Sequence, residues 1–221
     1  MRSSHPILRA AAVAILTGAL AGCVSVLPKS KPVQLYDFEG ARAASEAPPA
    51  ASAAAPFDVM KGVGSFDRPS AGDRILTKQG GKAAYIGEAR WVSPAAILFD
   101  QAVSRAFDEN RGPARLLVRG QVGRAEYILR LDVRDFEARY EAGPKAPPTV
   151  LVRVRAGLTR GDRSLAGEQM FEARVEAADN RVGPITEAFD KAVGQVTGEL
   201  VTWTNLAGAP VTAAVTPSPT P

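Results

Sequence analysis

The chain has 221 residues, of which 27 are Lys or Arg and 23 are Asp or Glu, so its formal net charge is +4. This small excess, without a basic run or an aromatic RNA-binding motif, argues against a nucleic-acid-binding protein. One cysteine, Cys23, excludes a disulfide framework, and the length suits a single globular domain.

The first 22 residues have the organisation of a signal peptide. Arg2 and Arg9 supply the positive charge, and the run Ala10–Leu20 is uncharged and apolar or small. That run is too short to span a bilayer, which takes about 20 apolar residues, but it fits the hydrophobic region of a cleaved signal. After cleavage the chain keeps 25 basic and 23 acidic residues, and its only histidine, His5, is lost.

The signal ends in Leu20-Ala21-Gly22-Cys23, which resembles the bacterial lipobox. We therefore expect Cys23 to be the lipidated first residue of the mature protein; the alternative is a plain secretory signal followed by an incidental thiol. A second acyl chain converts marginal membrane binding into a stable anchor. Because Val24 replaces the Asp typical of inner-membrane retention, the periplasmic face of the outer membrane is favoured over the inner membrane.

The sequence predicts three segments after the signal, one of which contains a long loop. Residues 23–31 form a lipidated tether, and residues 32–204 form one globular domain. An Ala/Pro-rich loop at residues 40–56 interrupts the domain near its start, and residues 205–221 form a disordered tail.

The first half of the domain contains short strands and one helix. Strands are expected at residues 33–38, 57–63, 74–78 and 82–86, and Gly62-Val63-Gly64 is interpreted as a turn. The helix should begin with Ser93 as N-cap and Pro94 in the first turn, and end at residues 110–113. Its predicted apolar stripe is Ala95, Leu98, Phe99, Ala102, Val103, Ala106 and Phe107.

The second half alternates long strands with a final helix. Between residues 127 and 140 the apolar parity changes near Arg134–Asp135, which predicts a β-bulge. Strands at 150–158 and 165–176 should form a hairpin with Gly161-Asp162 as a type II′ loop, a register that sets Arg155 opposite Glu168. A helix follows at residues 184–203. The fold class is therefore α+β: a two-layer sandwich of a largely antiparallel mixed sheet with both helices on one face.

Catalytic and metal motifs are missing from the mature sequence. Without His, it has no Ser-His-Asp or Cys-His site, and no P-loop or G-x-S-x-G string occurs. No catalytic, cofactor-binding or metal-ligating residue is predicted. The remaining candidates are carboxylates, either as a glycosidase-like acid/base pair or as partners of arginines on a solvated sheet face: Asp132, Asp135, Glu168, Glu172 and Glu176.

Tyr85, Arg90 and Trp91 are the candidate interaction surface. An arginine beside aromatic rings can stack on them and contribute to a docking site. The competing interpretation is a structural corner that packs Trp91 under the start of the following helix.

Several short motifs, in this order, resemble the ABC-type transport auxiliary lipoprotein family, which includes PqiC-like subunits of MCE-type systems. They are the lipobox, Val33-Gln34-Leu35-Tyr36, Tyr85 with Ala89-Arg90-Trp91 and Pro94, the 127–136 strand, and Ala188-Phe189-Asp190-Lys191-Ala192 before Trp203. The resemblance implies a non-catalytic membrane-anchored subunit that moves lipids or hydrophobic compounds, with an MCE-domain protein, a permease and an ATPase as partners. It leaves a homo-oligomer open.

Two other functions remain as alternatives. The protein could be a structural or assembly lipoprotein of an envelope complex, or an envelope hydrolase that uses a pair of carboxylates.

Replacing Cys23 with Ala should leave an unprocessed or soluble protein, because the thiol that accepts the lipid is gone. Membrane fractionation with a carbonate wash measures this. A Cys23→Ala protein that stays with the washed membranes would contradict the anchor.

Overall fold

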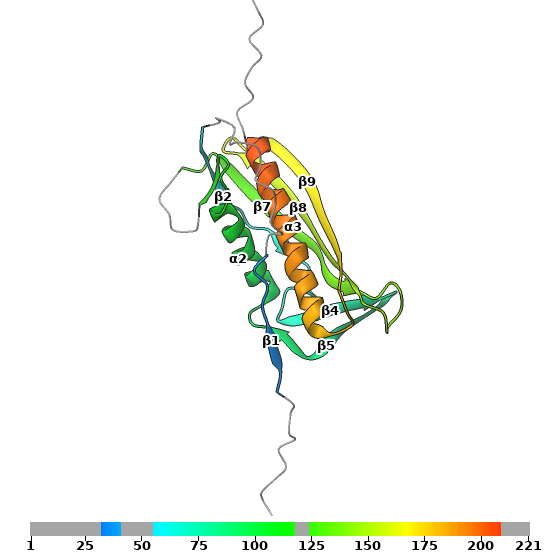
Figure 1. The fold of residues 1–221 in the computed structure, drawn as a ribbon. Coiled ribbons are helices and arrows are strands. Elements are labelled where there is room, and N and C mark those ends of the chain that lie inside the picture. The colour runs from blue at the N-terminus through cyan, green and yellow to red at the C-terminus, as the bar shows by residue number, and fades with distance from the viewer. Residues whose placement is uncertain (1–31, 41–54, 118–123, 209–221) are drawn as a thin grey trace, which may run out of the picture. The chain divides into compact units, whose positions relative to one another are not determined.

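The computed structural model describes residues 32–40, 55–117 and 124–208. The signal peptide, Cys23 with the whole tether, most of the 40–56 loop and residues 209–221 lie outside the described residues. The elements, shown in Figure 1, are β1 (Gln34–Tyr36), β2 (Phe57–Lys61), β3 (Ser65–Phe66), β4 (Arg74–Gln79), β5 (Lys82–Trp91), α2 (Ala95–Asp108), β6 (Ala114–Leu117), β7 (Tyr127–Arg139), β8 (Thr149–Arg160), β9 (Leu165–Glu176) and α3 (Val182–Gly208).

Strand β7 is the centre of the sheet. One of its edges pairs antiparallel with β8 over the whole strand, and β8 pairs antiparallel with β9. Its other edge pairs in parallel with β2, then β3, then β4 along its length. Strands β5 and β1 follow β4, and β6 lies outside β2. The sheet is therefore mixed, with long antiparallel pairings and short parallel ones.

Both helices lie on one face of this sheet (Figure 1). Helix α3 packs on β8 and β9, and α2 packs on α3 and β6. The seam contains an aromatic cluster in which the ring of Phe136 lies 4.9 Å from Phe189, and Trp91 lies 5.3 Å from Phe189 and 5.0 Å from Phe38. Close aromatic pairs of this kind add stability beyond their buried area. The predicted α+β sandwich with two helices on one face is confirmed.

The predicted bulge in β7 is present. The register with β8 shifts by one residue between Val133 and Asp135. As a result, Leu131 and Val133 before the shift and Phe136 after it all face the core. The extra residue, Arg134, reconciles two apolar runs of opposite parity.

The predicted hairpin register is wrong, although the hairpin exists. The N–H of Arg163 donates to the carbonyl of Arg160 at 2.9 Å, and Arg163 has a φ of +71°, so the loop has three residues instead of two. A second shift at Ala166 adds one more residue, and Arg155 pairs with Met170. Because the two shifts add up to two residues, the apolar face still points to the core beyond Ala166. Glu168 reaches Arg155 diagonally, at 2.8 Å.

The ends of both helices differ from the prediction. Pro94 is the N-cap of α2, without a side-chain hydrogen bond, and the N–H groups of Ala95 and Ala96 donate to the carbonyls of Gly72 (2.9 Å) and Ala71 (3.2 Å). Ser93 is therefore not the cap. Helix α3 continues to Gly208, so residues 205–208, expected in the disordered tail, belong to the fold.

Strand β1 holds the described N-terminal segment on the domain. It pairs in parallel with the end of β5, Gln34 with Ala89 and Tyr36 with Trp91. Beyond β1, the N–H groups of Glu39 and Gly40 both donate to the Asp190 carboxylate of α3, at 2.8 and 2.7 Å. The segment is thus attached to the sheet and to the helix layer.

Gly64→Ala should destabilise the mature protein. A Cβ at Gly64 would collide with the backbone carbonyl of Leu131, which cannot move aside as a side chain can. Strain of this kind typically costs about 1–3 kcal/mol. Urea unfolding measures it, with Gly72→Ala as control because a Cβ at Gly72 meets no atom within 4 Å. Equal stability of the two variants would show that β3 does not lie this close to β7.

Candidate functional site

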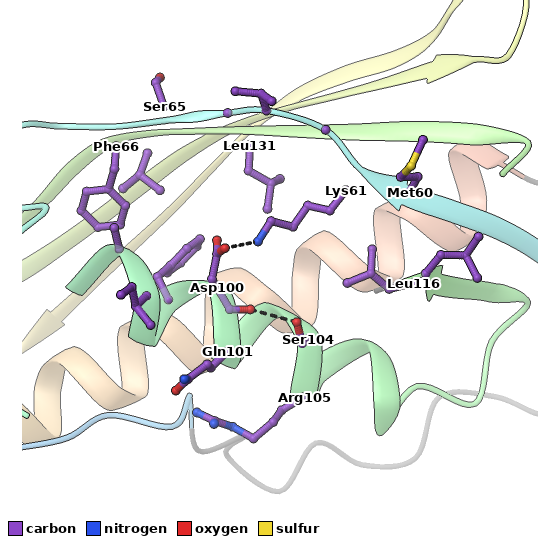
Figure 2. A pocket seen from close by; sticks show the side chains of 18 of the residues that line it. Met60, Lys61, Ser65, Phe66, Asp100, Gln101, Ser104, Arg105, Leu116 and Leu131 are labelled. Carbon is purple, nitrogen blue, oxygen red and sulfur yellow. Dashed lines mark hydrogen bonds and ion pairs between the residues drawn. The ribbon is translucent and has the colours of Figure 1, made fainter. Parts of the chain in front are cut away.

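A groove of about 1100 Å³ lies between helix α2 and the segment Met60–Phe66. Figure 2 shows Phe66 and Leu131 pointing into it, with Leu116 of β6 at one end. Its apolar lining side chains are Met60, Val63, Phe66, Ala96, Ile97, Phe99, Leu116, Leu117, Leu131 and Val133. A concave apolar site with a few polar groups is the usual form of a small-molecule binding site.

One wall of the groove is formed by the segment between β2 and β3, whose backbone lies very close to that of β7. Two glycines in this segment make the close approach possible. Strand β2 ends at Lys61, and the N–H of Gly62 donates to the carbonyl of Leu129 at 2.8 Å. Gly64 then lies directly against the backbone of Leu131, where a side chain has no room. The chain between β2 and β3 therefore lies flat on β7. The turn predicted at Gly62-Val63-Gly64 is therefore wrong, because this segment continues along β7 from Leu129 to Asp132.

An ion pair spans the groove. Lys61 of β2 contacts Asp100 of α2 in Figure 2, and the two side chains are 28% and 56% exposed. The Ser104 hydroxyl donates to the carbonyl of Asp100 at 3.0 Å. Exposed ion pairs usually contribute less than about 1 kcal/mol to stability. This pair therefore adds little to the stability of the fold but places two opposite charges in a groove whose other lining side chains are mainly apolar.

The structure separates the three predicted interaction residues. Trp91 is 2% exposed and belongs to the aromatic cluster of the core. Arg90 points to the opposite face, where it pairs with Asp73 at 2.8 Å. The Tyr85 ring lies 3.8 Å from the Arg74 guanidinium, and its hydroxyl donates to the carbonyl of Pro69 at 2.9 Å. An interaction surface here would consist of Tyr85 and Arg90 without Trp91.

The candidate carboxylates of β7 and β9 are paired with arginines. Arg153 contacts Asp135 at 3.1 Å and Glu172 at 2.7 Å, and Arg155 contacts Glu168 at 2.8 Å. An acid/base pair needs two carboxyl groups facing one substrate bond. The geometry supports a charged sheet face instead.

Sequence reasoning missed one buried carboxylate, Glu137, on the same sheet face. It is 0% exposed and contacts Lys78 at 2.6 Å and Arg139 at 2.7 Å. Burying a charge without partners is costly, and two cations provide the compensation here. The signal in the sequence was a Glu between two core residues, Phe136 and Ala138.

Neither a metal-binding cluster nor a membrane-spanning helix occurs among the described residues. Within residues 32–40, 55–117 and 124–208, no group of three or more His, Cys, Asp or Glu side chains is arranged to hold a metal ion. In the same part of the chain, no helix is long and apolar enough to cross a membrane.

Asp132 joins β3 to β7. It accepts a hydrogen bond from Ser65 at 2.7 Å and pairs with Arg130 at 3.2 Å. Burial raises the pKa of Asp132, but the hydrogen bonds from Ser65 and Arg130 and the charge of Arg130 outweigh it, so the pKa lies below the ordinary value of 3.8.

Asp132→Asn should therefore destabilise the protein at neutral pH and have a smaller effect in acid. A carboxyl group whose pKa is lowered by folding stabilises the fold above its unfolded pKa, and this stability is lost as the pH falls through the folded pKa. Urea unfolding at neutral pH and below about pH 3 measures the difference, with the exposed Asp108→Asn as control. An effect of equal size at both pH values would contradict this role.

Comparisons with known proteins agree with this fold. The structure is similar to a crystal structure of protein XCC0632 from Xanthomonas campestris, with 23% identity over 80% of this chain and 94% of that chain and a TM-score of 0.65. A crystal structure of an uncharacterized protein matches with 11% identity over 68% and 93% of the two chains and a TM-score of 0.56. No curated protein matches the chain.

A family model identifies the chain more specifically. The model describes the ABC-type transport auxiliary lipoprotein component, and it matches residues 42–201. This range runs from the Ala/Pro-rich loop to helix α3 and includes the whole groove. The match covers most of the chain, and the protein therefore belongs to the ABC-type transport auxiliary lipoprotein component family.

Proposed function

We propose that this protein is a non-catalytic, lipid-anchored subunit of an MCE-type transport system that moves lipids or other hydrophobic compounds across the envelope. The observation that carries the proposal is the family match over residues 42–201, which associates the chain with ABC-type transport and with a lipoprotein. The lipobox at Cys23 supplies the anchor in the same proposal.

The proposed division of labour follows from what the chain contains. Its sequence has no P-loop, so ATP hydrolysis is assigned to a separate ATPase, and a permease and an MCE-domain protein complete the system. This subunit contributes contact and positioning. With Val24 after the lipidated cysteine, it is assigned to the periplasmic face of the outer membrane.

The paired carboxylates favour this proposal over the hydrolase. Asp135, Glu168 and Glu172 each contact an arginine at 3.1 Å or less, and the two residues on β9 are exposed. A glycosidase needs two carboxyl groups directed at one substrate bond, whereas these three are held by arginines on a charged sheet face.

Affinity isolation from cross-linked cells tests the proposal. A C-terminally tagged full chain, isolated from membranes, should enrich an MCE-domain protein together with its permease and ATPase, as identified by mass spectrometry. Deletion of the gene should increase sensitivity to detergent or solvent, and the wild-type gene should restore resistance. Density-gradient fractions should place the protein in the outer membrane.

An untagged strain and the Cys23→Ala variant are the controls. If anchoring positions the subunit, Cys23→Ala should fail to restore resistance even when it is folded and present at the wild-type level. Enrichment of envelope assembly proteins without transporter subunits would instead support the structural alternative.

A further inference from the structure

We propose that the groove between α2 and Met60–Phe66 binds one acyl chain of a zwitterionic membrane phospholipid. This inference rests on the proposed function, because it assigns a ligand and a binding site to a subunit of a lipid-moving system. It adds that the subunit itself contacts the lipid.

The apolar interior of the groove suits a hydrocarbon chain. Phe66 of β3 and Leu131 of β7 point into it, and Leu116 of β6 lies at one end (Figure 2). The volume of about 1100 Å³ is comparable to the largest common ligand sites. Ile97 of α2 also lines the groove and is 48% exposed, so a hydrocarbon chain in the groove would cover apolar surface that water now contacts.

The backbone around the groove favours a lipid over an extended peptide. Strand β2 is hydrogen-bonded on both edges: Met60 pairs with Leu117 of β6 and with Ile128 of β7. Beyond β2, the N–H of Gly62 is bonded to Leu129. A peptide added along this wall would bury amide groups against apolar side chains, which costs free energy unless they find partners. An acyl chain has no polar groups to satisfy.

The charged residues of the groove favour one kind of headgroup. Lys61 and Asp100 form an ion pair across the groove, and Arg105 and Asp108 of α2 also line it, so the lining carries two positive and two negative side chains. A zwitterionic headgroup carries the complementary pair, a phosphate for Lys61 and an ammonium for Asp100. An anionic headgroup would match Lys61 but would meet repulsion from Asp100.

Photo-cross-linking in vesicles tests the site. The lipidated full chain is placed in vesicles of phosphatidylethanolamine and phosphatidylglycerol that contain a small fraction of phosphatidylethanolamine with a diazirine in one acyl chain. After irradiation and digestion, mass spectrometry should find lipid adducts on residues 57–66 and 95–108. The same diazirine on phosphatidylglycerol should label these residues less.

Ile97→Glu should reduce the adducts about tenfold or more, because an acyl chain would have to bury a carboxylate. Leu206→Glu is the matched control, since Leu206 is also an exposed apolar residue on a helix, 73% exposed, and does not line the groove. Ala96→Trp, which fills the groove without adding charge, should have the same effect as Ile97→Glu. Thermal unfolding checks that all three variants are folded.

Three results would overturn the proposal: adducts only on the N-terminal lipopeptide, equal labelling of the wild type and both groove variants, or a phosphatidylglycerol probe that labels as well as phosphatidylethanolamine. The vesicles contain no transporter, so the two experiments are independent. Absence of lipid adducts would overturn the groove proposal without affecting the affinity isolation that tests the proposed function. Failure of the affinity isolation would overturn the transporter assignment, while lipid adducts on the groove would still show that it binds lipid.

Discussion

The hydrogen bonding of β7 is the constraint on which the rest of the structure depends. One edge of this 13-residue strand is used by β8 throughout, and the other edge is divided among β2, β3 and β4. Between the end of β2 at Lys61 and the start of β3 at Ser65 the chain stays against β7, because Gly62 is hydrogen-bonded to Leu129 and Gly64 lies against the backbone of Leu131. The wall of the groove is a result of this division.

The sequence allowed the elements with a regular apolar period to be predicted. In β7 the parity change at Arg134 marked a bulge, and in α2 the stripe from Ala95 to Phe107 marked the buried face. The predicted hairpin register is wrong because the hairpin contains two extra residues, at Arg163 and Ala166. Two one-residue shifts put the apolar side chains back on the same face, so the sequence pattern looks the same as it would without any shift. The cap of α2 could not be predicted, since its hydrogen-bond acceptors come from a distant loop. Strands β3 and β6, of two and four residues, are too short to show a period.

The groove was harder to predict than the fold. Its lining residues come from β2, β3, α2, β6 and β7, and no local pattern relates residues so far apart in the sequence. Gly62 and Gly64 were interpreted as a turn, which is how such a pair usually behaves; only the position of Leu131 shows that they allow a close backbone approach. The charged sheet face was easier to predict from the sequence, because acidic residues alternate with arginines along its strands. Glu137 was the exception, as its burial depends on Lys78 from another strand.

The attachment of β1 has a mechanical consequence for a lipoprotein. Any pull between the membrane and the domain enters through the segment before Val33. A force directed along β1 acts perpendicular to its hydrogen bonds with β5, which is a shear geometry. These hydrogen bonds therefore share the force and must break together instead of one after another. If they yield, Phe38 must leave the aromatic cluster before the load reaches Glu39 and Gly40, which are held by Asp190. The domain thus has two successive points of resistance to tension, one in the sheet and one in α3.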